Sequence, residues 1–233
     1  MKSSFLFICL SLFSFVSWSQ NQLLTAEDSL GYKYREDQFY IGITYNIPTN
    51  VPSGVNARGL SGGIHFGYLR DMPLNERRNV ALAVGLGMTL DQYGQNLFIG
   101  ETKDEETIFT ILTNEINFDQ NRFSTAAVEV PLEFRWRSST ATTYQFWRIY
   151  AGVRAGYTYW YRSYFQQPGN AVSQTDIPEF NQFRMRATLS FGYGSINFFA
   201  SYSLQPFFDN AVTTDGQNID LRTFRAGLIF YLL

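Results

Sequence analysis

The sequence predicts an all-β fold, an eight-stranded antiparallel up-and-down transmembrane β-barrel. Three observations support this prediction. Eight segments alternate apolar with small or polar residues at a period of two, and no stretch of similar length has a helical period. Beyond the N-terminal leader, no apolar run is long enough for a transmembrane helix. Only Lys2, Lys33 and Lys103 among the 18 cationic residues are lysines, which is unusual for a surface that faces water.

The alternating segments follow one another along the chain and are joined by short and long connections in turn. The segments span residues 39–47, 60–68, 80–90, 126–137, 147–162, 183–193, 196–205 and 224–233. The short connections are 72–79, 138–145 and 194–195, and the long ones are 48–59, 91–122, 163–182 and 207–220. Short periplasmic turns and longer external loops are typical of outer-membrane barrels, so we expect both termini to be periplasmic.

The first three segments each have an apolar face and a small or polar face. The apolar faces are formed by Phe39, Ile41, Ile43, Tyr45, Ile47, Leu60, Ile64, Phe66, Tyr68, Val80, Leu82, Val84, Leu86, Met88 and Leu90. The opposite faces carry several glycines and the single histidine, His65. Small residues suit a narrow lumen, so this face is expected to point inward and the apolar face toward lipid.

Charged residues indicate the inner face of four of the last five segments, because they lie on one side of each alternation; segment 196–205 has no charge, and its inner face carries small and polar residues. The outer faces are predicted to hold Ala126, Val128, Val130, Leu132, Phe134, Trp136, Trp147, Ile149, Val153, Tyr157, Tyr159, Tyr161, Phe183, Leu189, Phe191, Tyr193, Ile196, Phe198, Phe224, Leu228 and Phe230. Aromatic residues near the ends of these faces resemble interfacial girdles. The same alternation places Trp160 and Arg162 in the lumen.

The predicted lumen contains a network of charges with a structural role. Its members are Glu129, Glu133, Arg135, Arg137, Arg148, Arg154, Arg184, Arg186 and Arg225. Arginine suits such a network because its planar guanidinium donates to several buried acceptors at once. If the turn after the fourth segment is centred between Ala141 and Thr142, Glu129 lies directly opposite Arg154.

The residues that precede the barrel are predicted to form two segments, of which the first is removed by cleavage. Residues 1–19 form a secretory signal peptide, with Lys2, an apolar run at 5–16 and cleavage before Gln20. Residues 20–37 form a periplasmic tail, and residues 38–233 form the barrel. The single cysteine, Cys9, lies in the signal peptide, so we expect no disulfide and no cysteine-ligated metal in the mature protein.

Residues 91–122 form a long loop with two apolar patches around 97–99 and 108–112, among acidic residues. Such patches favour a loop that folds over the barrel mouth or contacts a partner.

A catalytic role is not expected for any residue. Ser61 and His65 share the predicted lumen face, and a serine paired with a histidine would suit an outer-membrane lipid hydrolase. Nothing in the sequence locates an orienting carboxylate or an oxyanion site for this pair. We therefore expect no catalytic residue, no cofactor, no metal and no nucleic-acid partner.

Two stretches resemble the PorT family of Bacteroidetes outer-membrane barrels: DQFYIGITYN at 37–46 and HFGYLRDMPLNERRNVALAVGLG at 65–87. The resemblance implies a location in the outer membrane of a Gram-negative bacterium. It also implies a non-enzymatic accessory role in type IX protein secretion, or in gliding motility, through outer-membrane or periplasmic protein partners in addition to the surrounding lipids. The alternatives are a structural or assembly barrel unconnected to secretion and, third, the lipid hydrolase.

Overall fold

The computed structural model describes residues 37–102, 106–113, 116–138 and 146–232. The predicted signal peptide, the tail up to Glu36 and the turn at 139–145 lie outside these ranges. Within them the secondary structure consists of strands and turns, and none of the residues described forms a helix that could cross a membrane.

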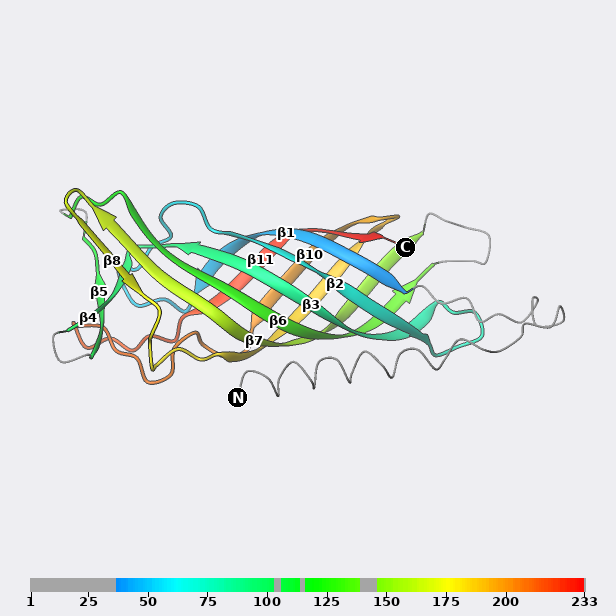
Figure 1. Cartoon of the computed structure of the whole chain (residues 1–233). Coiled ribbons are helices and arrows are strands. Elements are labelled where there is room, and N and C mark those ends of the chain that lie inside the picture. The colour runs from blue at the N-terminus through cyan, green and yellow to red at the C-terminus, as the bar shows by residue number, and fades with distance from the viewer. Residues whose placement is uncertain (1–36, 103–105, 114–115, 139–145, 233) are drawn as a thin grey trace, which may run out of the picture. The chain divides into compact units, whose positions relative to one another are not determined.

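Eight long strands close into a barrel (Figure 1). They are β1 (Gln38–Thr49), β2 (Gly62–Pro73), β3 (Val80–Gly94), β6 (Gln120–Arg137), β7 (Trp147–Gln167), β9 (Phe183–Tyr193), β10 (Ile196–Ser203) and β11 (Arg222–Leu232). Each pairs with the next in antiparallel register, and β1 pairs with β11 to complete the circle. Closure leaves no edge whose backbone groups would be unsatisfied in lipid. The predicted fold class is confirmed.

Over most of the barrel, the exposed and buried faces of the strands are those that the alternation in the sequence predicts. Apolar residues assigned to the outer face are exposed, as at Phe39, Val130 and Phe191, whereas the opposite residues are buried in the lumen. Gly67 and Gly87 pair across β2 and β3, and a Cβ at either one would collide with the hydroxyl oxygen of Tyr40. Glycine at this pair therefore lets the Tyr40 ring lie against the inner wall.

A β-bulge in β7 reverses the faces of its last part, so the prediction for Trp160 and Arg162 is wrong. Ala127 pairs with Thr158 and Ala126 pairs with Trp160, which leaves Tyr159 as an extra residue. Beyond this point Trp160 and Arg162 are exposed, while the odd-numbered Ser163 and Phe165 are buried. A bulge inserts one unpaired residue and so moves every later side chain to the other face.

The barrel has one end with short turns and one end with long loops (Figure 1). The turn end carries the 74–79 connection, the Gly194–Ser195 hairpin, the start of β1 and the end of β11. The loop end carries the connections 50–61, 95–119, 168–182 and 204–221, and two of them contain strands that the sequence pattern does not predict. β4 (Leu97–Glu101) pairs with β5 (Thr107–Ile111), and β8 (Asn170–Gln174) extends the sheet beside β7.

The long loops fold together over the loop end of the barrel. Their buried apolar residues and those of the strand ends form the loop-end cluster: Val55, Tyr93, Leu97, Ile99, Phe109, Phe123, Ile177, Phe180, Phe207, Phe208, Ala211, Ile219 and Leu221. Backbone hydrogen bonds join the loops, for example from Thr214 to Phe109 at 2.9 Å and from Asp209 to Glu179 at 2.8 Å. The apolar patches of the 91–122 loop thus pack over the mouth, which is one of the two outcomes expected of them.

Candidate functional site

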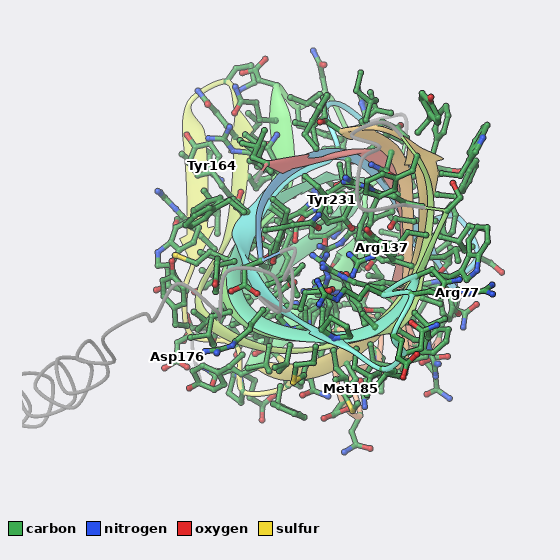
Figure 2. All side chains as sticks on the ribbon, turned by 90° about the vertical axis from the view of Figure 1, so that its right-hand side faces the viewer. Arg77, Arg137, Tyr164, Asp176, Met185 and Tyr231 are labelled. Carbon is green, nitrogen blue, oxygen red and sulfur yellow. The ribbon has the colours of Figure 1, made fainter. Side chains whose placement is uncertain are left out.

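Among the described residues, the lumen contains seven arginines and four carboxylates, all of them buried. They are Arg135, Arg137, Arg148, Arg154, Arg184, Arg186, Arg225, Asp71, Asp91, Glu129 and Glu133. Figure 2 views the barrel from the turn end and shows Arg137 and Tyr231 inside the ring of strands, with Arg77 and Met185 outside it. Strand β6 supplies four of them, and β7 and β9 supply two arginines each.

Toward the turn end, two carboxylates bind arginines from β6 and β7. Asp71 accepts from Arg135 at 3.1 Å and from Arg137 at 2.5 Å. Glu133 pairs with Arg135 at 3.2 Å and with Arg154 at 3.3 Å. Each of these carboxylates therefore receives two guanidinium groups, whose attraction offsets the cost of burying it away from water.

Toward the loop end, the other two carboxylates, Glu129 and Asp91, also bind arginines. Glu129 pairs with Arg186 and, at 3.7 Å, with Arg154. Asp91 pairs with Arg225 at 2.6 Å and accepts hydrogen bonds from Asn46 at 3.0 Å and Thr89 at 3.2 Å. Arg154 links the two halves, because it contacts both Glu129 and Glu133.

The described arginines of the lumen outnumber its carboxylates by three. Some of these arginines lie over aromatic rings. The guanidinium of Arg184 lies 3.8 Å from the ring centre of Phe207 in the loop-end cluster, and it donates to Thr158 at 3.3 Å. Arg148 lies 4.5 Å from the ring centre of Phe146, and no described carboxylate pairs with it. Ring faces attract cations, more strongly where water is excluded, so these contacts offset part of the unpaired charge.

All the residues predicted for the network lie in the lumen, but the predicted register is wrong by two residues. Glu129 pairs across the ladder with Gly156, and Arg154 with Pro131. The ion pair between Glu129 and Arg154 nevertheless forms, because a long arginine side chain spans the offset. Arg148 and Arg184 are the two members without a carboxylate partner among the described residues.

Asp71 and Asp91 also belong to the network, although they were not predicted as members from the sequence. Both continue the inward alternation of their strands, Asp71 after His65 and Leu69 in β2, and Asp91 after Thr89 in β3. The predicted segments ended at Tyr68 and Leu90, just before them. Extending the period of two by two steps on β2 and by one step on β3 would have placed both carboxylates in the lumen.

Ser61 and His65 do not form a catalytic pair. Ser61 immediately precedes β2 and His65 lies four residues further along the extended chain, a separation of about 13 Å. The Ser61 hydroxyl accepts from the backbone nitrogen of Gly94 at 2.9 Å, whereas the His65 ring lies 4.7 Å from the ring of Phe199. No group of three or more histidine, cysteine or acidic residues in the described ranges has the arrangement of a metal site.

The filled lumen predicts that the protein does not conduct ions as a porin does. An eight-stranded barrel has just enough interior for its own side chains, and here large charged and aromatic residues occupy it. Purified protein in planar lipid bilayers should give no stable large conductance step. Reproducible steps of porin size would contradict a closed lumen.

Comparison with protein families agrees with this architecture. The family described as outer membrane protein beta-barrel domain matches residues 18–211, which is more than half of the chain. A similar solved structure is that of Ail, the attachment invasion locus protein of Yersinia pestis, in complex with the heparin analogue sucrose octasulfate. Identity to Ail is 13%, the match covers 85% of this chain and 99% of the Ail chain, and the TM-score is 0.34. Among curated proteins no sequence matches. The extent of the family match shows that this chain belongs to the outer membrane protein beta-barrel domain family.

Proposed function

We propose that this outer-membrane barrel is a non-enzymatic accessory component of type IX protein secretion and acts through protein contacts. The observation that carries the proposal is the filled lumen under a closed loop end, which leaves the outer surfaces as the places where a partner can bind. The resemblance of residues 37–46 and 65–87 to the PorT family supplies the secretion role.

The orientation proposed here puts the turn end and both termini in the periplasm. Support comes from the unequal connections, because outer-membrane barrels have short periplasmic turns and longer external loops. The turn end then presents the 74–79 connection, part of the stretch that resembles the PorT family, to periplasmic partners. Leu74 is a large apolar side chain exposed in this turn, as expected of a contact residue.

A structural or assembly barrel unconnected to secretion is the second candidate, and the ion network favours it equally. The lipid hydrolase is disfavoured by the separation of Ser61 and His65, and a His65→Ala variant that lost a lipid-hydrolysing activity would revive it. Neither alternative predicts a secretion defect that depends on the 74–79 turn.

The test is deletion of the gene followed by measurement of secreted cargo in the culture medium. We expect cargo to be lost from the medium and restored by the wild-type gene. Leu74→Asp should fail to restore secretion, whereas Ser195→Asp, in the neighbouring exposed hairpin, should restore it. Both variants must first reach the outer membrane in wild-type amounts. Normal secretion by the deletion strain would exclude the secretion role and leave the structural barrel.

A further inference from the structure

Arg70 lies on the lipid-facing side of β2, between Tyr68 and Met72. It is the one charged residue at the outward positions of β1, β2 and β3, all of which the structure describes. The side chain is exposed, and within the described chain it has no ion pair. A cation on this face is costly unless it reaches the interface or finds an anion.

Arg70 lies toward the turn end of the apolar face, level with Asp37, which precedes β1. Arg70 pairs with Val84, and Val80, two outward positions nearer the turn end, pairs with Trp136. Trp136 belongs to the aromatic residues of the turn end, where Trp147 also packs against Tyr193 at 5.6 Å between ring centres. The long side chain of Arg70 can reach the level of these rings by extending along the barrel wall.

A groove of about 410 Å³ lies next to Arg70 on the same outer surface. It is lined by Phe39, Phe66, Tyr68, Leu86, Met88 and Val128, together with Tyr40, Gly67 and Gly87. Tyr68 lines the groove and Arg70 is the next outward residue, about 7 Å further along the strand. The apolar groove and the unpaired cation are therefore parts of one surface.

The polar groups between the groove and Arg70 are already paired. The Tyr68 hydroxyl donates to Asp37 at 3.0 Å, and Asp37 also accepts from the backbone nitrogen of Asp71 at 3.0 Å. The rings of Phe39 and Tyr68 pack at 5.1 Å between centres. These contacts hold the end of the groove in place and leave the Arg70 guanidinium available to a ligand.

We propose that the groove and Arg70 form a binding site for one glycerophospholipid, with an acyl chain in the groove and the phosphate on Arg70. A guanidinium binds phosphate through two parallel hydrogen bonds, which would neutralise the cation where it stands. The choice of a glycerophospholipid rests on the proposed orientation, in which the turn end lies in the periplasmic leaflet. The shared chemistry, a phosphate beside acyl chains, also occurs in lipid A.

The test uses the mature protein in detergent, incubated with phosphatidylglycerol, with diacylglycerol of the same chains, or with lipid A, and examined by native mass spectrometry. We expect one phosphatidylglycerol to be retained and diacylglycerol to be lost because it lacks the phosphate. Lipid A should be retained less than phosphatidylglycerol, because its several acyl chains exceed a single groove of this size. Arg70→Gln should weaken retention roughly tenfold or more, the value of a hydrogen bond to a charged group. Leu86→Ala should also weaken it, by shortening the wall of the groove.

Two variants serve as matched controls. Arg77→Gln removes an exposed cation from the turn at the same end, and Leu189→Ala removes an exposed apolar side chain from β9, away from the groove. Both should retain the lipid as the wild type does. Equal retention by Arg70→Gln, no retention by the wild type, or preference for lipid A would each overturn the proposal. Because the assay uses purified barrel, its outcome is independent of the secretion assay.

Discussion

Replacing Glu129 with glutamine is expected to lower the free energy of unfolding by about 3 to 5 kcal/mol, the cost of breaking a buried ion pair by removing one partner. Glu129 pairs with Arg186 and Arg154 in the lumen, where water is scarce. Glutamine keeps the size of the side chain, so the change removes charge and leaves packing intact. The excess of arginines over carboxylates would rise, and both arginines would lose their shared anion.

This expectation is checked by urea unfolding of the barrel in lipid vesicles, followed by tryptophan fluorescence. Asp220→Asn is the control, because it breaks the exposed ion pair with Arg222 at 3.2 Å and should cost less than about 1 kcal/mol. Adding Arg186→Gln to Glu129→Gln should recover part of the loss by removing one unpaired cation. Wild-type stability of Glu129→Gln would show that the ion pairs contribute little to holding the barrel together.

Replacing Val130 with arginine is expected to cost about 2 to 4 kcal/mol, the value for arginine at the bilayer midplane on the lipid face of a barrel. Val130 is exposed on β6 among the outward apolar residues Val128 and Leu132, and Trp136 at the turn end is the third outward residue after it. The guanidinium would be far from both interfaces and would have no lipid phosphate within reach.

The measurement is the fraction of heat-modifiable, folded barrel after insertion into vesicles, together with its urea midpoint. Val130→Leu, which enlarges the side chain without adding charge, should behave as the wild type. Equal folding and stability of the arginine and leucine variants would mean that Val130 does not face the middle of the bilayer.

The closed barrel and most of its faces could be predicted because lipid and lumen impose opposite chemistry on alternate residues. The alternation failed in the last part of β7, where aromatic residues occupy both faces from Tyr157 to Tyr161 and conceal the extra residue at Tyr159. A bulge is a property of two paired strands, and the sequence of one strand does not specify it.

All network members except Asp71 and Asp91 were predicted from the sequence, but the strand register that brings them together was not. The register depended on the assumed turn centre, and an error of two residues kept Glu129 and Arg154 on the correct face while changing the residues opposite them. Phe146 lies only two residues before Arg148, so the alternation itself suggests that contact. The ring of Phe207 reaches Arg184 only when loops and strand ends fold together. Local patterns do not contain such contacts.

Charged residues concentrated on β6 and β7 can pair with one another early in folding. Glu129, Glu133, Arg135 and Arg154 lie on two strands adjacent in sequence, and the ion pairs of Arg154 with both glutamates join those strands directly. Contacts between neighbouring strands form earlier and at a smaller entropic cost than contacts across a closed barrel. The β6–β7 hairpin can therefore neutralise its own glutamates before the other strands arrive, so that fewer bare charges enter the membrane when the barrel inserts.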